Sequence, residues 1–443
     1  MRLPKVREIR GFLAECCRQA FEKPLYSFGI EAYSVGVRVA GMRNAKARKL
    51  ACGQREIWKC LDEKIKSGDR YIWVHAASLG EFEQGRPLIE KIKREHPEYK
   101  VLLTFFSPSG YEVRKNYPEA DCVVYLPFDT PGRVRKFLYK VNPEIAVFVK
   151  YEFWRNYLEE LWRRQIPTYL ICGAFRKDQF FFKKRSAWYG YWLKWYTKIF
   201  VQDESSRELL KKIHVDNVEV CGDTRFDRVA EIAAHRKPIP EIAAFTRQGE
   251  QNHPVTFMAG SSWQPDEDIY IPWLDRHPEI KVVVAPHEFD DARLAELKAR
   301  FKNGAVLFSE LKKDPSLADG KQALIIDCFG ILSSAYQYCD IAYIGGGFGT
   351  GIHNINEAAV YGVPVIFGPK FSKFIEAREL TALGGAIAID GEESFDRTMM
   401  RLCDTGERAR TGDISLRYIK SKLGATPRIV EEIFKKGVIS GKK

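Results

Sequence analysis

Short apolar runs that alternate with helical stretches constrain the fold of this chain more than any other feature. Each run is brief and rich in β-branched or aromatic residues, as buried strands are. Their regular alternation with helical stretches indicates parallel strands joined by crossover helices. The runs span residues 71–75, 101–106, 122–126, 145–149, 168–172, 199–202 and 218–221, and then 255–259, 282–285, 305–308, 324–326, 341–344, 363–367 and 386–389.

A polar stretch with two prolines, residues 235–253, separates these runs into two sets of similar size. A chain of 443 residues is also too long for one ordinary core. The sequence therefore predicts an α/β protein with two Rossmann-like domains, whose ligands bind at the carboxyl ends of the strands in the cleft between them. The predicted divisions are a helical, membrane-associating segment at 1–60, a first domain at 61–235, a linker at 236–253 and a second domain at 254–443.

A glycine-rich stretch, GGGFGTG at residues 345–351, follows one predicted strand and precedes a short helix. Missing β-carbons let the backbone turn sharply, and the helix start offers N–H donors, so an anion such as phosphate is the expected ligand. The spacing fits neither G-x-G-x-x-G nor a P-loop, which disfavours NAD and ATP. A turn without a ligand stays possible. Asn354 and Glu357 lie one helical turn apart and either hold a sugar or form a cap and its capping-box partner.

Charged residues follow three predicted strands of the first domain. Glu81, after the first, is a candidate general base, although Ser78-x-x-Glu81 also reads as a capping box. Pro87 would lie inside a helix begun at Ser78, so the main helix is expected to begin nearer Pro87. Glu152, after the fourth strand, is expected to face the same cleft or to begin a surface helix. Arg225, after the seventh, is a candidate to neutralise a leaving phosphate.

The second domain has candidate binding residues at two strand ends. The small loop 260–262 and His287, which follows Pro286, suit a base, a ribose or a phosphate, although a lone histidine is usually structural. The segment Asp266-Glu267-Asp268 matches a D-x-D metal motif formally, but an acidic first helical turn is favoured. The sequence contains neither H-E-x-x-H nor G-x-S-x-G, so zinc peptidase and serine hydrolase activities have no support.

The composition indicates an anionic partner. Lys and Arg number 70 against 58 Asp and Glu, a net charge of +12, which suits nucleic acid, a phosphorylated small molecule or an acidic membrane surface. The ten cysteines are scattered without C-x-x-C spacing, as in a reduced cytoplasmic protein. Basic residues in the first twenty positions argue against a secretory signal, and no apolar run approaches twenty residues.

Two segments have the composition of surfaces that bind other molecules. Residues 24–41 are mostly apolar and aromatic and are followed by several basic residues, so they are expected to lie in a membrane interface or to pack as a helix on the domain. Residues 176–200 mix basic and aromatic side chains, which suits a membrane and is also how single-stranded nucleic acid is bound.

Together these motifs resemble the Kdo (3-deoxy-D-manno-octulosonic acid) transferases of lipopolysaccharide assembly. The resemblance covers about Leu25 to Ile433, nearly the whole chain. It depends on the order and number of the motifs, which are HAASLGE at 75–81, FSPSGY at 106–111, YLPFD at 125–129, EFW at 152–154, GDTRFD at 222–227 and GIHNINE at 351–357.

This resemblance implies an inverting GT-B enzyme, without a metal or cofactor, that moves Kdo from CMP-Kdo to a lipid A precursor (lipid IVA). The work would take place at an anionic membrane surface, on the cytoplasmic side of the inner membrane. By the resemblance, Glu81 is the general base, and Glu152 and Arg225 stabilise the transition state. The residues that would hold the CMP-sugar are Pro286, His287, Gly330, Ile331, Leu332, Asn354, Ile355, Asn356 and Glu357.

The chain departs from the family pattern at several positions. Pro286-His287-Glu288 replaces the common Pro-Arg-His, and residues 354–357 read Asn-Ile-Asn-Glu in place of Asn-Pro-Leu-Glu. Ile331 occupies a position where glutamate is common, and Arg225 is often lysine. Another GT-B enzyme that uses a UDP-sugar therefore remains an alternative. A basic nucleic-acid-binding protein is a weaker one, and no nucleic-acid partner is expected.

Overall fold

The computed structural model describes the backbone of residues 6–179 and 182–435, and the side chains of 22–179, 182–183 and 190–435. The chain divides into two compact units. The first comprises Met1–Arg225 and Gly424–Lys443, and the second comprises Phe226–Leu423. Each is described by itself.

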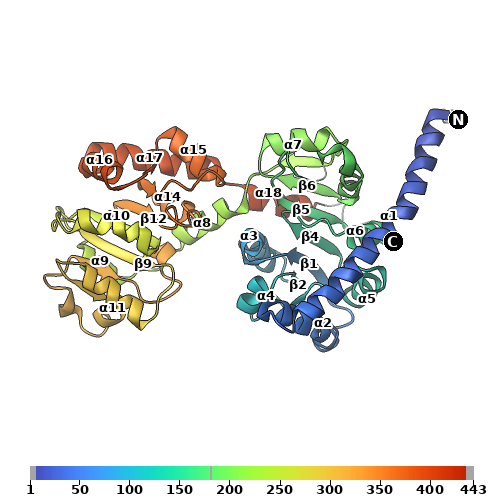
Figure 1. Cartoon of the computed structure of the whole chain (residues 1–443), viewed down its shortest axis with the longest axis horizontal. Coiled ribbons are helices and arrows are strands. Elements are labelled where there is room, and N and C mark those ends of the chain that lie inside the picture. The colour runs from blue at the N-terminus through green and yellow to red at the C-terminus, as the bar shows by residue number, and fades with distance from the viewer. Residues whose placement is uncertain (1–5, 180–181, 436–443) are drawn as a thin grey trace. The chain divides into compact units, whose positions relative to one another are not determined.

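The first unit contains a seven-stranded parallel sheet with the order β3-β2-β1-β4-β5-β6-β7. The chain winds outward from β1 in one direction and then from β4 in the other, which is the doubly wound pattern (Figure 1). Its strands are β1 (Arg70–Ala76), β2 (Tyr99–Phe105), β3 (Cys122–Tyr125), β4 (Ile145–Val149), β5 (Thr168–Gly173), β6 (Lys198–Val201) and β7 (Val218–Val220).

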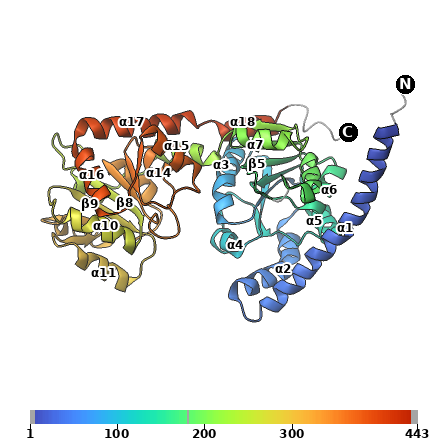
Figure 2. The same cartoon turned by 45° about the horizontal axis from the view of Figure 1, so that its top comes forward.

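Helices cover both faces of this sheet, as Figures 1 and 2 show. Two long helices precede the first strand, and the last helix of the chain returns to pack on α3. The helices are α1 (Val6–Ala40), α2 (Ala45–Lys64), α3 (Leu79–Glu95), α4 (Pro108–Arg114), α5 (Pro131–Val141), α6 (Arg155–Arg163), the 3-10 helix η2 (Lys184–Trp195), α7 (Glu204–Lys211) and α18 (Ala425–Ile433).

The second unit contains another seven-stranded parallel sheet, with the order β10-β11-β9-β8-β12-β13-β14. Here the winding reverses between β8 and β12. The strands are β8 (Thr256–Ser262), β9 (Lys281–Pro286), β10 (Ala305–Leu307), β11 (Ala323–Ile325), β12 (Ile341–Ile344), β13 (Val365–Phe367) and β14 (Ala386–Ala388).

The helices of the second unit follow its strands in turn. The connecting helix α8 (Thr224–Ala234) begins at the boundary between the units. The others are α9 (Pro240–Thr246), α10 (Gln264–Leu274), α11 (Asp291–Arg300), α12 (Phe308–Leu311), η3 (Pro315–Ala318), α13 (Leu332–Ala335), η4 (Tyr336–Tyr338), α14 (Asn356–Ala359), α15 (Ile375–Leu383), α16 (Glu392–Cys403) and α17 (Thr405–Ser421).

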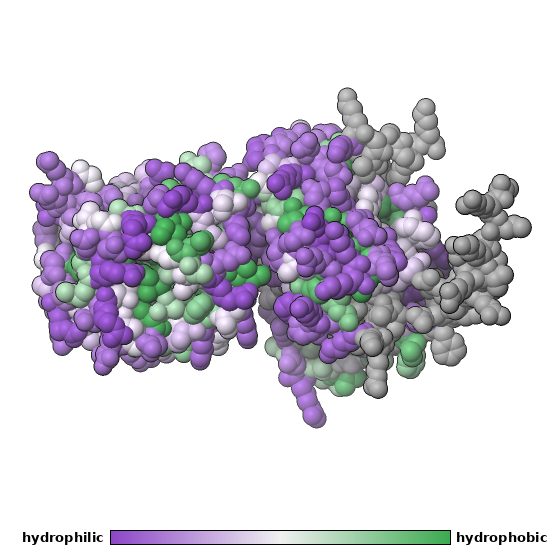
Figure 3. Space-filling model, turned by 90° about the horizontal axis from the view of Figure 1, so that it is seen from above, coloured by the Kyte–Doolittle hydropathy of each residue, from purple (hydrophilic) through white to green (hydrophobic). Residues whose placement is uncertain are grey.

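Burial explains why the strands could be found from sequence. Both faces of each sheet are covered, so the strands read as continuous apolar runs, and the side chains of β4 are buried without exception. Each of the fourteen predicted runs overlaps one observed strand, and those at 145–149 and 341–344 coincide with β4 and β12. Polar residues remain on the outside, where they dominate the face drawn in Figure 3.

The domain boundaries differ from the predicted ones. The predicted linker at 236–253 contains α9, whose Ile242 and Phe245 join the core of the second unit. The final helix α18 was assigned to the second domain, but Ile429 and Ile433 are buried in the core of the first unit against α3. The described residues of the predicted segment 1–60, which begin at Val6, likewise belong to the first unit. Apolar packing of these helices therefore sets the boundaries, and the proline-rich composition does not.

Candidate functional site

Two of the predicted catalytic residues lie at the point where the winding of the first sheet reverses. Strands β1 and β4 are neighbours there, and a carboxylate follows each strand, Glu81 in the first turn of α3 after β1 and Glu152 in the loop after β4. Parallel strands end at the same edge, so these loops emerge on one side of the sheet. Doubly wound sheets bind their ligands at this position.

Glu81 lies in the first turn of α3 and is half-buried. Ser78 is the N-cap, but its side chain does not cap the backbone; its hydroxyl donates a hydrogen bond to Glu81 Oε2 instead. The capping-box interpretation is therefore wrong for the Ser78 side chain. The expected start near Pro87 is also wrong, because α3 begins at Leu79 and continues through Pro87.

Glu152 is held in a buried position by the loop after β4. Lys150 begins this loop with φ of 69°, a left-handed conformation that is rare for a residue with a side chain. The Glu152 side chain accepts hydrogen bonds at Oε2 from His75 Nε2 at 2.9 Å and from Trp154 Nε1 at 2.5 Å. Among the described residues, the side-chain hydrogen bonds to Glu152 are made at Oε2 and none is made at Oε1.

A chain of buried hydrogen bonds fixes the orientation of His75. Trp73 Nε1 donates to Thr104 Oγ1 at 2.8 Å, and this hydroxyl lies 2.9 Å from His75 Nδ1. When the Thr104 hydroxyl donates to Nδ1, the neutral imidazole carries its proton on Nε2 and donates it to Glu152. Each group then donates a hydrogen bond to the next, from Trp73 to Thr104, from Thr104 to His75 and from His75 to Glu152.

Arg225 is oriented by a neighbouring carboxylate that the sequence did not single out. Asp223 accepts hydrogen bonds from Arg225 Nε at 2.9 Å, from Gln84 at 2.9 Å and from Gln202 at 2.8 Å. Burial alone would raise the pKa of Asp223, but Arg225 and these hydrogen bonds outweigh it and hold the pKa below its usual range. The guanidinium is thus a paired, positioned cation and not an isolated positive charge.

The glycine loop of the second unit turns most of its N–H groups inward. Asp266 of α10 accepts from the backbone N–H of Gly346 at 2.9 Å and from Phe348, and so occupies the anion position of this loop with a carboxylate of the protein. The N–H groups of Gly345, Gly349 and Gly351 donate to backbone carbonyls. The expectation that this loop cradles phosphate through its own N–H groups is therefore wrong for these positions.

Close backbone packing explains the glycines. A β-carbon at Gly345 would lie 2.2 Å from the carbonyl oxygen of Ser261, and one at Gly347 would lie 2.5 Å from the backbone nitrogen of Gly368. Gly346 has φ of 91°, where a side chain is strained. The glycine loop brings the ends of β8, β12 and β13 into contact.

Hydrogen bonds connect some of the predicted donor-binding residues. Glu357 accepts from Asn354 Nδ2 at 3.1 Å and from Ser333 at 2.5 Å, which joins the 354–357 segment to α13 beside Ile331 and Leu332. Gly330 and Ile331 form the turn before that helix and Leu332 begins the helix; Gly330 is exposed and the other two are half-exposed. The side chains of Ile355 and Asn356 are fully buried, so only their backbone can face a ligand. Whether these residues bind the donor stays a prediction.

A second group at the same strand ends contains an aromatic stack. Trp263 packs on His287 with ring centroids 4.6 Å apart, and His287 lies 4.3 Å from His353. Burial and the neighbouring His287 lower the pKa of His353 to about 4, so His353 is neutral at pH 7. Pro286 ends β9 directly before His287. The predicted pair Pro286 and His287 is therefore joined to His353, which precedes Asn354 in the chain.

Several supporting residues were missed by sequence reasoning. Thr104, Asp223, Trp263 and Ser333 contact His75, Arg225, His287 and Glu357, respectively. Only Asp223 is close in sequence to its partner, two positions before Arg225, so the sequence held a signal for Asp223 alone. Asp266 begins α10 as expected and binds backbone N–H groups. Among the residues that the structure describes, no cluster of three His, Cys, Asp or Glu could hold a metal ion.

Helix α1 carries an exposed apolar stripe. Tyr26, Ile30 and Val37 pack against the core of the first unit, whereas residues three, four or seven positions apart on another face are open to solvent. Leu25 is 68% exposed, Phe28 73%, Val35 54% and Val39 56%. Of the described helices, none has the length and apolar character to cross a membrane. The expectation that residues 24–41 pack as a helix on the domain is therefore confirmed, and their placement in a membrane interface stays a prediction.

The basic aromatic segment 176–200 is partly internal. Trp192, Tyr196 and Phe200 belong to buried packing of the first unit, and Tyr196 donates a hydrogen bond to the carbonyl of Glu152 at 2.5 Å. Residues 180 and 181 and the side chains of 184–189 lie outside the described part. Within this segment, Tyr196 thus supports the Glu152 loop.

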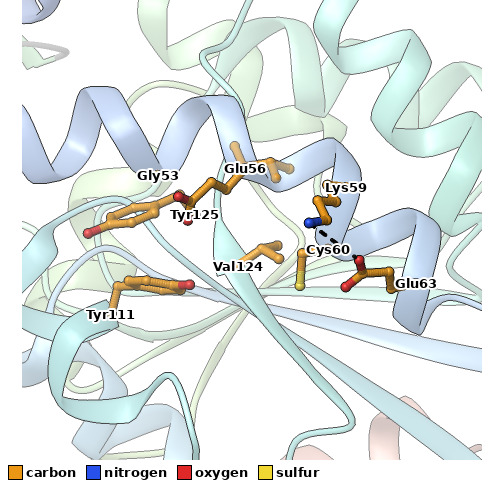
Figure 4. A pocket seen from close by; sticks show the side chains of 9 residues that line it. Gly53, Glu56, Lys59, Cys60, Glu63, Tyr111, Val124 and Tyr125 are labelled. Carbon is orange, nitrogen blue, oxygen red and sulfur yellow. Dashed lines mark ion pairs between the residues drawn. The ribbon is translucent and has the colours of Figure 1, made fainter.

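A separate cavity of about 320 Å³ lies between α2, α4 and β3 (Figure 4). Tyr111 and Tyr125 pack together with ring centroids 4.2 Å apart, and Cys60 lies on the wall formed by α2. A hydrogen bond with Cys122, helped by Lys64, outweighs burial and lowers the pKa of Cys60 to about 7. This thiol is therefore substantially ionised at neutral pH.

Comparisons with known proteins identify relatives of the chain. Residues 49–228 match the family model described as 3-deoxy-D-manno-octulosonic-acid transferase (kdotransferase). The 3-deoxy-D-manno-octulosonic acid transferase of Aquifex aeolicus is 28% identical over 331 residues, covering 73% of this chain and 83% of the relative. That of Haemophilus influenzae is 23% identical over 374 residues, covering 81% and 86%. The chain is a relative of the Kdo transferases.

Solved structures of low sequence identity share the two-domain fold of the chain. The UDP-GlcNAc 2-epimerase of Neisseria meningitidis has a TM-score of 0.57 at 14% identity, covering 82% of this chain and 100% of that one. MurG of Acinetobacter baumannii has a TM-score of 0.53 at 10% identity, covering 82% and 99%. The predicted GT-B class, with two Rossmann-like units, is confirmed. The predicted cleft between the units stays a prediction.

Proposed function

We propose that the chain is an inverting glycosyltransferase that moves Kdo from CMP-Kdo to a hydroxyl of a lipid A precursor, lipid IVA. The observation that carries the proposal is the pair of carboxylates at the β1–β4 reversal, one half-exposed and one buried in a directed hydrogen-bond network. The relation to Kdo transferases supports the choice of sugar.

Glu81 serves as the general base. Its carboxylate is half-buried beside a serine hydroxyl, at the first turn of a helix whose N-terminus stabilises negative charge. The base removes the proton of the acceptor hydroxyl as that oxygen attacks the anomeric carbon of Kdo, and CMP leaves with the electrons of the broken bond. This role requires no metal or cofactor from the protein.

Glu152 and Arg225 stabilise the transition state from fixed positions. The carbon under attack gains positive character as the bond to CMP breaks, and the carboxylate of Glu152 offers Oε1 toward such charge while His75 and Trp154 hold Oε2. Arg225, oriented by Asp223, is suited to developing negative charge on the reacting groups. Because these partners are already in place, little reorganisation is needed during the reaction.

The second unit binds the CMP-sugar. Glu357, with Asn354 and Ser333 beside it, offers a carboxylate to the ribose hydroxyls, and the backbone of Ile355 and Asn356 continues this surface. Pro286 and His287 form the neighbouring part, and Gly330, Ile331 and Leu332 supply the turn before α13 and its first residue. Neutral His353 behind His287 keeps this corner free of an additional charge near pH 7.

The protein works at the cytoplasmic face of the inner membrane. The exposed stripe of α1 provides apolar area for the lipid interface, and the net charge of +12 favours an anionic surface. An acceptor that carries acyl chains and phosphates is presented at such a surface.

The test is a transfer assay with CMP-Kdo and a tetraacylated, bisphosphorylated disaccharide, read by product mass. Glu81→Gln should abolish transfer while CMP still raises the unfolding temperature, because the change removes the base and leaves the second unit intact. Glu83→Gln, on the same helix turn and also one charge fewer, is the matched control and should retain activity.

Two results would contradict the proposal. Near-normal turnover of Glu81→Gln would remove Glu81 as the base. A thermal shift that is clearly larger with UDP than with CMP would favour a UDP-sugar donor and overturn the assignment of Kdo transfer.

A further inference from the structure

We propose that a pocket lined by Arg38, Arg55 and Arg133 binds the phosphomonoester headgroup of a membrane lipid. The inference rests on the proposed membrane placement of the chain, but it assigns a specific ligand group to a site remote from the carboxylates. All the residues that line the pocket belong to the first unit.

The pocket has a volume of about 290 Å³, which is ample for a phosphate group and part of its ester. Its lining comes from α1, α2, the loop before α5 and α5 itself, which carries Arg133. The lining combines apolar and aromatic groups with three arginines. The lining residues are Arg38, Ala51, Gln54, Arg55, Trp58, Pro127, Phe128 and Arg133.

Arg133 has an unused hydrogen-bond donor at this site. Its Nη1 is buried and has no hydrogen-bond partner, whereas Nη2 donates to Glu31 at 3.3 Å. A buried guanidinium nitrogen without a partner costs free energy unless a ligand accepts its proton. A rotation of the Arg133 guanidinium that turns Nη1 toward the pocket would let an anionic oxygen accept from this donor.

The charge of the pocket matches a dianion. Arg38 and Arg55 form no ion pair with any described residue, and Glu31 provides one negative charge against three positive ones. The surplus of two suits a phosphomonoester, which carries nearly two negative charges at pH 7 and three acceptor oxygens. A phosphodiester has one charge and two such oxygens and therefore leaves donors unused. Guanidinium groups bind phosphate in a paired geometry that lysine does not offer.

The position of the pocket points to a lipid as the source of the phosphate. Arg38 lies on α1 directly before Val39, which is 56% exposed and belongs to the apolar stripe. A helix that places this stripe among acyl chains holds Arg38 at the level of the headgroups. Lys136 lies 4.2 Å from the centroid of the Trp58 ring and adds positive charge beside the pocket.

The experiment measures binding of the full chain to vesicles of phosphatidylcholine that contain either phosphatidic acid or phosphatidylglycerol, at matched surface charge. We expect about tenfold tighter binding to the phosphatidic acid vesicles, because only that lipid is a phosphomonoester. Arg55→Gln and Arg38→Gln should abolish this preference. Arg43→Gln, which removes one exposed charge outside the pocket, should keep it.

The remaining outcomes separate the two proposals. Equal binding to both vesicles overturns the headgroup pocket and leaves membrane docking in place. No binding to either vesicle overturns membrane docking. A third outcome combines two results: inorganic phosphate binds the chain in solution only when Arg55 is present, and the vesicles show no preference. This outcome assigns the pocket to a soluble phosphate and overturns the lipid source. Transfer of Kdo is measured separately and does not enter these comparisons.

Discussion

Replacement of Thr104 tests the hydrogen-bond network beneath Glu152. Thr104→Val removes one hydroxyl at nearly constant volume from a residue that is fully buried. Trp73 Nε1 then loses its acceptor, and His75 Nδ1 loses the donor that fixes its tautomer. The imidazole can instead donate Nδ1–H to the Thr104 main-chain carbonyl at 3.1 Å, which turns a lone pair at Nε2 toward the Glu152 carboxylate.

The expected loss of stability follows from these changes. An unsatisfied buried donor costs about 1–3 kcal/mol, and the lost bond to Glu152 adds roughly 1 kcal/mol or more. We therefore expect Thr104→Val to lower the free energy of unfolding by about 2–4 kcal/mol. Thr104→Ser keeps the hydroxyl and removes one methyl group, a loss of about 1 kcal/mol. The difference between the two variants isolates the hydroxyl.

Urea unfolding and nitrogen-15 NMR of the His75 ring provide the measurements. The wild-type ring should show the Nε2–H tautomer, and Thr104→Val should shift it toward the Nδ1–H tautomer, with a fall in kcat. Thr104→Ser should keep the wild-type tautomer. An Nδ1–H tautomer in the wild-type protein, or equal stability of the two variants, would refute the direction of the network.

Three further predictions concern other parts of the chain. The pKa of about 4 for His353 means that the unfolded chain binds a proton more readily than the folded chain between pH 6.5 and 4, so stability falls as the pH drops through that range. The urea midpoints at pH 7 and pH 5 should therefore differ less in His353→Gln than in the wild-type protein. An unchanged difference would contradict this prediction. Gly347→Ala should lower the free energy of unfolding by about 1–3 kcal/mol or more, because the added β-carbon meets the backbone of Gly368. Gly132→Ala, whose β-carbon has nothing within 4 Å, should be neutral or slightly stabilising. Thermal unfolding measures both variants. Alkylation of Cys60 by iodoacetamide, followed by peptide mass with exposed Cys52 as reference, should be half-maximal near pH 7, and a midpoint above pH 8 would argue against the Cys122 hydrogen bond.

Strand positions were predictable because burial on both faces of a parallel sheet leaves a local signature. A run such as Ile145–Val149 reads the same in the sequence and in the structure. Domain boundaries were less predictable. The residues 236–253 look like a linker by their prolines and charges, but Ile242 and Phe245 reach a core that the sequence does not reveal.

The candidate site was predictable at the strand ends and less so in its contacts. Glu81, Glu152 and Arg225 follow strands, and parallel strands deliver such residues to one edge without further information. Glu152 and Arg225 are oriented by His75 and Asp223, and the partners of these two residues lie far away in the sequence. Thr104 contacts His75 across 29 positions, and Gln84 contacts Asp223 across 139. No local pattern records such distances.

The glycine loop shows the same division most clearly. Its sequence determined that the backbone turns tightly after β12, since only glycine permits the approach of Gly347 to Gly368. Its sequence could not determine where the N–H groups of that turn would point. The tertiary structure decided this by placing Asp266 beneath Gly346, because a buried carboxylate and buried N–H groups satisfy one another better than either remains unpaired. Local periodicity and residue chemistry thus determined the elements and the strand ends, and long-range packing decided which polar groups meet there.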